Sequence, residues 1–413
     1  MNKGLLSFDE ALNALLAVAH PVSEVESVPT QEATGRVLAK DVVSSIFVPP
    51  LDNSSMDGYA VRCADVTESG ASLTVAQRIP AGSVGHTLAA GTAARIFTGA
   101  PVPQGADAVV MQEVCSVSGD TVTIAHVPRP GEWIRRKGED IAEGQIVLSA
   151  GTLLGPAEIG VAASVGAASL PVFRCYRVAL FSTGDELSMP GEVLKPGGIY
   201  NSNRYTLKSL LEGLGCVVSD MGIVPDQLDA TRAALRVAAA GNDLILTSGG
   251  VSVGEEDYVK PAVEAEGQLG LWKVAIKPGK PLAFGSVNRT LKVGTGGTAA
   301  FIGLPGNPVS SFVTFVMLVR PFILKAQGRG ISGMSSILPR AIRLRADFAC
   351  MGDARREFLR ARVNERGGLE LFANQSSGVL TSCAWADGLV DNPPGQAITP
   401  GDSVSFLPFS ILL

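Results

Sequence analysis

Side chains that bind transition metals or carry redox chemistry are scarce in this sequence. Its 413 residues include three histidines and six scattered cysteines, and no C-x-x-C pair occurs. Zinc and iron–sulfur centres need clusters of such ligands. The sequence therefore argues against both centres, and isolated thiols of this kind are typical of reduced, structural cysteines in a cytoplasmic protein.

A basic stripe and a long hydrophobic run are also missing. The net charge is −5, from 34 basic and 39 acidic side chains, and the basic residues are not concentrated in one stretch. This argues against nucleic acid as a partner. The N-terminal segment becomes acidic before any signal-peptide core, and no run of 18 or more apolar residues occurs. We therefore expect a soluble, cytoplasmic protein with no membrane association.

The most informative stretch is residues 241–257, where an apolar run gives way to glycines and then to acids. Residues 243–247 predict a strand that is covered on both faces of a parallel sheet. The glycines that follow let several backbone N–H groups gather around an anion such as phosphate. Acids at 255–257 would need a cation beside that phosphate, and Mg2+ fits best because it commonly bridges carboxylates and substrate phosphates.

An ordinary Gly-rich connection between a strand and a helix is the alternative for this loop. It contains neither a Walker loop nor the G-x-G-x-x-G fingerprint. Similar turns follow two other apolar runs: Ser182–Glu186 follows residues 178–181, and Pro305–Pro308 follows residues 299–304. Because ligands of open α/β sheets bind beyond the carboxyl ends of the strands, we expect the three turns to form one crevice.

The order of the remaining patterns predicts a multidomain fold of α/β and all-β parts. Residues 1–45 and 144–175 are expected to form a discontinuous domain I, interrupted by a small β domain II over 46–143. Residues 176–328 alternate strands and helices, which predicts a central parallel-sheet α/β domain III with helices on both faces. Residues 329–413 predict a small C-terminal β barrel or sandwich, domain IV.

Individual elements can be placed within these domains. Residues 8–19 have helical spacing, and Ser7 with Glu10 predicts a capping box at the start of that helix. The sequence 294–299 is similar to a dinucleotide loop, but it precedes a strand, so we expect a hairpin. Further helices are expected at 156–163, 202–214, 228–240 and 309–322, and strands at 36–43, 73–79, 93–97, 108–112, 121–124, 216–224, 271–276, 341–344, 357–363, 369–373 and 403–407.

Three loops of the β domain carry more polar groups than a turn requires. They are residues 52–59, 97–101 and 135–140. Each loop alone is most simply a solvated turn. Any functional role depends on the family that the whole set of motifs resembles.

Six motifs together resemble one family. They are Ser55-Met-Asp-Gly-Tyr-Ala60, Thr98-Gly-Ala-Pro-Val-Pro103, Ser182-Thr-Gly-Asp-Glu-Leu187, the stretch Thr247–Asp257, Lys277-Pro-Gly-Lys-Pro281 and Leu304-Pro-Gly-Asn-Pro308. In this order they resemble the MoeA-type molybdopterin molybdenumtransferases and the equivalent domain of gephyrin, over essentially the whole chain. The resemblance implies four domains in an elongated homodimer, with the active site between the α/β domain of one subunit and the β domain of the other.

The resemblance also implies a reaction and its site. Molybdate would be transferred to the dithiolene of adenylylated molybdopterin, with Mg2+-dependent release of AMP, in molybdenum cofactor biosynthesis. The implied catalytic residues are Asp57, Thr98, Asp140, Glu186, Asp226 and Asp257, of which Glu186, Asp226 and Asp257 would also belong to the metal site. The adenylylated pterin would lie along Ser182, Thr183, Gly184, Asp185, Ser248, Gly249, Gly250, Ser252, Gly254, Pro305, Gly306, Asn307 and Pro308. Molybdate would be held by Lys277, Lys280, Arg355, Ser376 and Ser377, which offer the charge-assisted donors that a dianion needs.

Two alternative functions stay open at this point. A stand-alone molybdopterin adenylyltransferase would resemble residues 176–328 only, so the additional domains argue against it. A non-catalytic scaffold is permitted by the relationship to gephyrin, although the retained acidic residues argue against decay of the site. The partners that the resemblance suggests are a second copy of the chain, a molybdopterin adenylyltransferase and downstream chaperones of molybdoenzymes.

Overall fold

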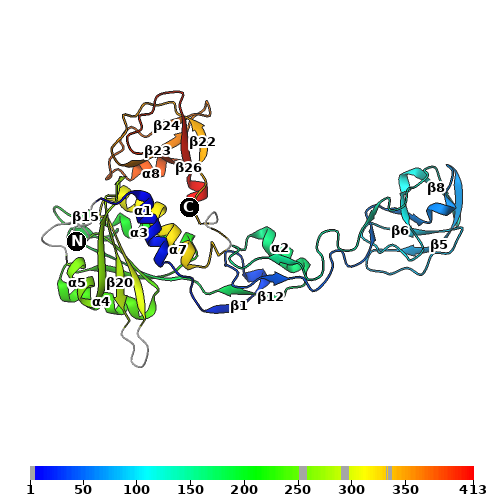
Figure 1. Ribbon diagram of the computed structural model, residues 1–413, viewed down its shortest axis with the longest axis horizontal. Coiled ribbons are helices and arrows are strands. Elements are labelled where there is room, and N and C mark those ends of the chain that lie inside the picture. The colour runs from blue at the N-terminus through cyan, green and yellow to red at the C-terminus, as the bar shows by residue number, and fades with distance from the viewer. Residues whose placement is uncertain (1–4, 251–257, 290–296, 332, 334–336) are drawn as a thin grey trace.

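The chain is extended along one axis, with an α/β unit and a C-terminal β unit at one end and a second β unit at the other (Figure 1). The computed structural model describes residues 5–250, 258–289, 297–331, 333 and 337–413. The predicted site residues Ser252, Gly254 and Asp257 lie outside the described residues.

A six-stranded sheet forms the α/β unit, in the order β16-β13-β17-β21-β20-β18. Four of its strands are mutually parallel, namely β16 (Val217–Val224), β13 (Arg177–Thr183), β17 (Leu244–Ser248) and β21 (Thr298–Leu304). The strand β20 (Pro281–Asn288) is antiparallel to β21 and to the edge strand β18 (Gly267–Lys273). The prediction of a parallel sheet is correct for the first four strands and wrong for β20.

Strand β20 was absent from the sequence prediction because Gly285 interrupts its apolar pattern. A Cβ at this position would collide with the carbonyl oxygen of Gln268 on the neighbouring strand β18. The glycine is therefore explained by close approach of two backbones, which periodicity cannot reveal. Consecutive antiparallel strands β20 and β21 also fit the predicted hairpin, whose connection includes residues outside the described ranges.

Helices cover both faces of the sheet, because successive strand side chains point to opposite faces. Phe181, Ile245 and Phe301 pack in one core cluster with residues of α4 (Leu228–Gly241) and α5 (Val259–Glu266). Leu180, Leu246 and Ile302 pack in a second cluster on the other face. Most of its helical residues come from α1 (Phe8–Val18), α3 (Ser202–Gly213), α6 (Pro308–Thr314), the π-helical η4 (Phe315–Val319) and α7 (Arg320–Ala326).

Helix α1 begins at the residue that the sequence predicts, but it packs against a different unit from the one predicted. Ser7 Oγ accepts a hydrogen bond from the N–H of Glu10, and the Glu10 carboxylate accepts one from the N–H of Ser7. Its buried side chains Phe8, Leu12 and Leu15 belong to the core of the α/β unit. The predicted packing of this segment against residues 144–175 is therefore wrong for α1, because sequence order cannot show which sheet an amphipathic helix covers.

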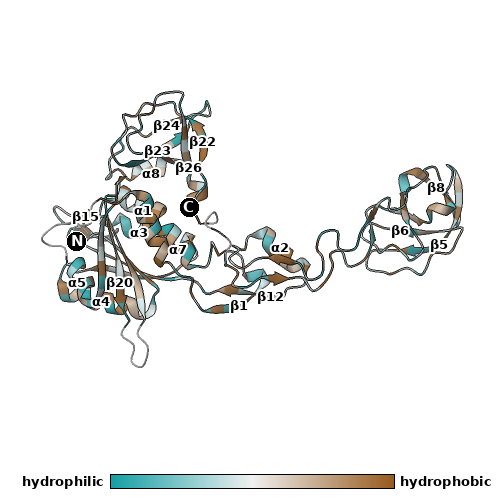
Figure 2. Cartoon of the chain, in the orientation of Figure 1, coloured by the Kyte–Doolittle hydropathy of each residue, from teal (hydrophilic) through white to brown (hydrophobic). Residues whose placement is uncertain are grey.

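One helical run meets the length and hydropathy of a membrane span, contrary to the expectation from the sequence. It is Pro308–Ala326, and 89% of its apolar window is buried inside the protein. Figure 2 shows hydrophobic residues along the part of this run that contains α7. Burial of this extent is that of a core helix packed on a sheet, so the run needs no lipid to cover it.

Short paired segments form a narrow middle unit next to the α/β unit (Figure 1). Its strand pairs are β1 (Val25–Pro29) with β12 (Ser169–Phe173) and β2 (Val42–Val43) with β11 (Ile146–Leu148), and it contains η1 (Thr30–Glu32) and α2 (Pro156–Ser164). Strand β1 was not predicted. The strand expected over 36–43 is reduced to β2 and isolated bridges at Val37 and Leu38.

The β unit at the far end contains a sheet in the order β7-β4-β6-β5-β9-β8. These strands are β7 (Ala108–Met111), β4 (Gly58–Val61), β6 (Thr92–Ile96), β5 (Ala71–Ile79), β9 (Thr121–Ile124) and β8 (Cys115–Ser118), with β3 (Asn53–Ser54) paired to β10 (Ile134–Arg135) and the turns η2 (Cys63–Asp65) and η3 (Gln112–Val114). The strands predicted at 73–79, 93–97, 108–112 and 121–124 are confirmed. We call this part the distal β unit.

The C-terminal segment forms a sheet that also recruits a strand from the α/β segment. Its strands are β19 (Ile276–Lys277), β23 (Arg356–Val363), β25 (Gly388–Asn392), β26 (Ser403–Pro408), β22 (Ile342–Arg345) and β24 (Leu369–Leu371), and its helices are α8 (Thr381–Trp385) and α9 (Phe409–Leu412). In the β19–β23 pair, Ile276 is opposite Arg356 and Lys277 is opposite Glu357. This pairing brings two distant parts of the sequence to one place. The short pair β14 (Leu187–Ser188) and β15 (Ile199–Tyr200) follows β13.

Candidate functional site

The loops beyond the parallel strands meet in one cavity of about 670 Å3. The β13 loop contributes Thr183, Gly184 and Glu186, the β17 loop contributes Gly249 and Gly250, and the β21 loop contributes Pro305, Gly306 and Asn307. Asp226, which follows β16, lines the same cavity. The expected convergence of the three turns is therefore confirmed for their described parts.

A second cavity of about 550 Å3 adjoins the first. The two cavities share Thr183, Glu186, Gly249, Gly306 and Asn307 as lining residues. Ser248, Pro308 and the helix α3 residue Asn203 line the second cavity only. Because they share lining residues, we treat the two cavities as one cleft across the carboxyl ends of the parallel strands. A cleft of this size can hold a ligand made of more than one chemical group.

The glycines of the β17 loop are required by the backbone and by crowding. Gly249 and Gly250 have φ values of 91° and 67°, in the left-handed region that favours glycine. A Cβ on Gly250 would collide with Val259 and approach Thr183 Oγ1 to 2.7 Å. Glycine at these two positions therefore allows the turn of the β17 loop that lines the cleft.

Asn203 ties two of the cleft loops together. Its side-chain amide Nδ2 donates to Ser248 Oγ and to the carbonyl oxygen of Gly306, each over 2.7 Å. Asn203 lies in the first turn of α3, where Asn201 caps the helix by accepting from the N–H of Arg204. A capped helix end thus fixes the separation between the β17 and β21 loops.

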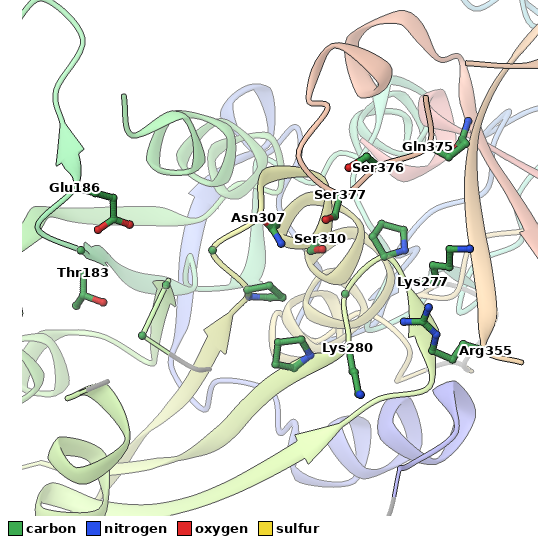
Figure 3. Close-up of a pocket in the computed structure, with 18 of the residues that line it drawn as sticks. Thr183, Glu186, Lys277, Lys280, Asn307, Ser310, Arg355, Gln375, Ser376 and Ser377 are labelled. Carbon is green, nitrogen blue, oxygen red and sulfur yellow. The ribbon is translucent and has the colours of Figure 1, made fainter. Parts of the chain in front are cut away.

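A group of cationic and hydroxyl side chains forms the opposite wall of the cleft. Lys277, Lys280, Arg355, Ser376 and Ser377, the five residues predicted to bind the oxyanion, all line the first cavity. Figure 3 shows Lys277 and Arg355 on one side of the cavity and Thr183 and Glu186 on the other. The β19–β23 pairing explains why residues 78 positions apart, Lys277 and Arg355, lie close together.

Two of these cations are paired with carboxylates. Lys277 Nζ lies 3.1 Å from Asp353 Oδ2 and 3.1 Å from Glu357 Oε1, and Arg355 Nε lies 3.1 Å from Asp353 Oδ1. The hydrogen bond to Glu357 is the main reason that the pKa of Lys277 is raised. The hydrogen bonds from Arg355 are the main reason that the pKa of Asp353 is lowered. Both groups are therefore held in their charged forms, and an oxyanion would compete with Asp353 for both cations.

The serine segment of this wall is supported by a fully buried arginine. Arg360 is 1% exposed, and its backbone N–H donates to Gln375 Oε1 over 3.0 Å. The Gln375 amide in turn donates to the carbonyl oxygens of Arg360 and Phe372. This support holds Ser376 and Ser377 at the edge of the cavity.

Several lining or supporting residues were missed by the sequence analysis. Ser310 and Gln375 line the cavity, Asp353 and Glu357 pair with its cations, and Asn203 ties its loops. Ser310 sits two positions after the Pro305–Pro308 turn and Asp353 two positions before Arg355, so proximity in sequence to a predicted residue was an available signal. Asn203 had no such signal, because only the tertiary structure places α3 over the two loops.

Other predicted residues are not brought to this cleft within one chain. Asp57 and Thr98 lie in the distal β unit, where the Asp57 carboxylate accepts from the N–H and Oγ1 of Thr98 over 2.8 and 2.7 Å. These hydrogen bonds lower the pKa of Asp57. Asp140 is an exposed residue that lies just after the distal β unit. In the α/β unit, Ser182 is 1% exposed and Asp185 is exposed, and neither lines the two cavities.

The described residues offer few ligands for a metal ion and no reactive thiol near the cleft. Among the described residues, no group of three or more His, Cys, Asp or Glu side chains could hold a metal ion. Glu186 and Asp226 nevertheless line the same cavity, and the third predicted metal residue, Asp257, lies outside the described ranges. The six cysteines are free, and burial raises the pKa of Cys63 and Cys216 to about 12. Such thiols stay protonated near neutral pH and are poor nucleophiles.

Comparison with known families accounts for nearly the whole chain. Residues 6–166 match the MoeA N-terminal region (domains I and II), residues 179–325 match a probable molybdopterin binding domain, and residues 343–409 match the MoeA C-terminal region (domain IV).

Individual relatives agree with these matches. The molybdopterin molybdenumtransferase of Haemophilus influenzae is 44% identical over 327 residues, covering 79% of this chain and 78% of its own. Molybdopterin molybdenumtransferase 2 of Mycobacterium tuberculosis is 38% identical, covering 89% and 90%. The crystal structure of the molybdopterin biosynthesis MoeA protein from Pyrococcus horikoshii OT3 superimposes with a TM-score of 0.84 at 28% identity, covering 98% and 100%.

An α/β domain with a polar cleft beyond its parallel strands, flanked by separate β units, defines a multidomain protein of the molybdopterin-binding class. More narrowly, the chain belongs to the MoeA family, and it is a molybdopterin molybdenumtransferase of molybdenum cofactor biosynthesis. The expected family and enzyme class are therefore confirmed.

Proposed function

We propose that this transferase takes adenylylated molybdopterin as its pterin substrate and inserts molybdate into the dithiolene with release of AMP. The observation that carries the proposal is the asymmetry of the cleft. Glycine loops and the acids Glu186 and Asp226 line one side, and three cations with two serine hydroxyls line the other. A nucleotide-linked pterin suits the first side, and a dianion suits the second.

The residues of each wall take separate roles in this proposal. The pterin and its phosphates lie along Thr183 to Glu186, Ser248 to Gly250 and Pro305 to Pro308. Lys277, Lys280, Arg355 and the Ser376–Ser377 pair hold the oxyanion and orient it toward the dithiolene sulfurs, which the substrate supplies. In phosphoanhydride cleavage the protein mainly positions the reacting groups and stabilises the charge that develops.

Magnesium is the proposed cofactor. Two carboxylates in one cavity fit it, because Mg2+ in proteins is commonly held by one or two carboxylates together with substrate phosphates. Glu186 and Asp226 would hold the ion, and Asp257 is the third candidate. When bound, Mg2+ would neutralise charge on the bridging phosphate oxygens.

We further propose that the active enzyme is a homodimer in which the distal β unit of one copy reaches the cleft of the other. The distal β unit, which contains Asp57 and Thr98, lies at the opposite end of the chain from the α/β unit (Figure 1). Asp57, Thr98 and Asp140 line neither cavity of the cleft in their own chain, so a second copy is the simplest way to use them. The middle unit also exposes hydrophobic side chains that a partner could cover, including Val25, Val43, Ile146 and Leu153. The four-domain division, with limits at 45, 143, 175 and 328, belongs to the same proposal, except that α1 packs in the core of the α/β unit. A cytoplasmic location belongs to it as well.

The alternatives make different predictions for the same assay. Purified protein supplied with adenylylated molybdopterin and Mg2+ should release AMP only when molybdate is added. Release of AMP without molybdate would contradict insertion. Consumption of ATP with unmodified molybdopterin would instead identify an adenylyltransferase, and absence of any turnover by the dimer would favour a scaffold.

A further inference from the structure

Two arginines of the distal β unit lie side by side, and neither forms a salt bridge with a described residue, although the charge of Arg95 acts on the nearby Asp57 carboxylate and helps to lower its pKa. Arg78 on β5 and Arg95 on β6 are paired in register across neighbouring parallel strands. Each guanidinium carbon lies 4.5 Å from the centroid of the same Phe97 ring, so the two cations lie within twice that distance of each other. No carboxylate lies within 4.0 Å of either guanidinium in the described part of the chain.

This arrangement is electrostatically unfavourable unless something offsets it. Like charges at such a separation repel each other. Stacking on Phe97, the second ring contact of Arg95 with Tyr59 at 5.2 Å and the nearby Asp57 charge offset part of that cost for Arg95, whereas Arg78 has only the Phe97 contact. Two other arginines nearby in the sequence do form salt bridges, Arg62 with Asp65 at 3.7 Å and Arg136 with Asp52 at 2.7 Å. An anion between or beside the two guanidinium groups would remove the repulsion.

The two arginines differ in how much of their hydrogen-bonding capacity is used. Arg95 donates to the carbonyl oxygen of Gly58 over 2.8 Å and to Gln112 Oε1 over 2.6 Å. Arg78 is exposed and donates no side-chain hydrogen bond to any described residue. Its guanidinium carbon lies over the Phe97 ring, and its N–H groups have no acceptor among the described residues, so they can donate to phosphate oxygens.

The position of this pair indicates its ligand. Phe97 directly precedes Thr98, and Arg95 is bonded to Gly58, which directly follows Asp57. The arginine pair therefore adjoins the Asp57–Thr98 pair that the proposed dimer would bring to the partner's cleft. In that cleft the substrate phosphates would lie near Glu186 and Asp226, and cations from a second copy would add to the positive charge of the proposed Mg2+.

We propose that Arg78 and Arg95 form a phosphate-binding face that contacts the phosphate groups of the adenylylated substrate held in the cleft of a second copy. This inference rests on the proposed function. Arg78 is a binding residue in it, and Arg95 both binds and holds the turn at Gly58.

The test uses the full-length dimer and the exposed residue, because loss of Arg95 would also release the Gly58 turn. Arg78→Gln should raise the concentration of adenylylated molybdopterin needed for half-maximal AMP release by about tenfold, the usual size for one charge-assisted contact. The molybdate concentration needed at saturating pterin should not change. Arg78→Lys keeps the positive charge but loses the planar guanidinium, so its requirement for adenylylated molybdopterin should lie between those of wild type and Arg78→Gln.

Arg62→Gln is the matched control, since Arg62 lies beyond the opposite end of β4 and already has an acidic partner. If Arg78→Gln changes the pterin requirement no more than this control does, the proposal is overturned. A raised molybdate requirement, or a loss of dimer in sedimentation, would overturn it as well, because Arg78 would then serve the oxyanion or the subunit contact.

A separate binding measurement distinguishes this inference from the proposed function. Retention of adenylylated molybdopterin by ultrafiltration needs no turnover, and wild-type protein should retain more of it than Arg78→Gln, with a difference that shrinks as salt is added. That result would support the phosphate-binding face even if AMP release proved independent of molybdate. If the two proteins retain equal amounts and the wild-type enzyme turns over, the proposed phosphate-binding face is wrong, and the proposed reaction is not affected.

Discussion

The two ends of the central sheet use polar side chains in opposite ways. At the amino end, Arg174 forms a bidentate pair with Asp243 over 2.7 and 2.9 Å and bonds Glu24 over 2.6 Å. Asp243 also accepts from the N–H of Arg177 and from Arg289. At the carboxyl end, the loops surround open cavities, and the buried hydroxyls of Ser182 and Thr247 have no hydrogen-bond partner among the residues that the structure describes.

The difference shows where this domain gains stability and where it retains binding capacity. The ion pair between Arg174 and Asp243, which is largely shielded from solvent, connects the segment before β13 to the segment before β17. Polar groups at the other end are held by loops that leave room for a ligand. A change at the amino end should therefore affect unfolding, and a change at the carboxyl end should affect substrate requirements.

The largest expected effect is on stability at the amino end. Asp243→Asn removes the charge that compensates Arg174, which is only 9% exposed, and should lower the free energy of unfolding by about 3 kcal/mol. Urea denaturation measures this loss. Asp229→Asn, at an exposed residue with a contact of 4.0 Å to Arg232, is the control and should change little. Equal stability of the two variants would contradict a stabilising role for the buried pair.

The next largest effect concerns the side of the cleft that is proposed to bind the oxyanion, which is formed by Lys277, Lys280, Arg355, Ser376 and Ser377. Lys277→Ala should raise the molybdate concentration needed for half-maximal turnover by roughly 30-fold, about 2 kcal/mol of binding, because a charge-assisted donor is lost and Glu357 is left uncompensated. Lys273→Ala, an exposed lysine outside both cavities, is the matched control. An unaltered molybdate dependence in Lys277→Ala would place the oxyanion elsewhere.

A smaller effect should follow from loosening the two loops that Asn203 connects. Asn203→Ala removes the hydrogen bonds to Ser248 and Gly306 and should raise the pterin requirement about tenfold, since the loops lose their fixed separation. Steady-state kinetics at saturating molybdate measure it. The control is Asn288→Ala at an exposed strand end. A loss of stability without a change in pterin requirement would show that the tie is structural only.

The smallest effect is the acid sensitivity of the amino end. Burial of Asp243 opposes ionisation, but the hydrogen bonds from Arg174 and Arg177 outweigh it and hold the pKa of this carboxyl below its ordinary value. A lowered folded-state pKa contributes stability above the unfolded pKa, near 3.9, and this contribution is lost as the pH falls through the folded value. Wild-type stability should therefore decline more steeply than that of Asp243→Asn below about pH 4. Parallel declines in urea midpoint would refute the assignment.

Much of the cleft was predictable because its strands carry an unmistakable pattern. The apolar runs before Ser182, Ser248 and Pro305 end at turns, and parallel strands bring such turns to one edge. The antiparallel strand β20 and the docking of α1 were not predictable, because each depends on a neighbour distant in sequence. Resemblance to a family supplied Lys277 and Arg355, whose meeting depends on the β19–β23 pair.

The amino-acid sequence by itself determined the family, the order of the units and the glycines at which the cleft loops turn, because these depend on local backbone preference and on motif identity. Only the tertiary structure decided that Asp353 pairs with Lys277 and Arg355, that Glu357 pairs with Lys277, that Asn203 connects two loops, and that Arg78 and Arg95 both lie over Phe97. The physical reason is that electrostatic and hydrogen-bonding partners act over a few ångströms in space, and strand register, which sets those distances, is fixed by packing across the whole fold.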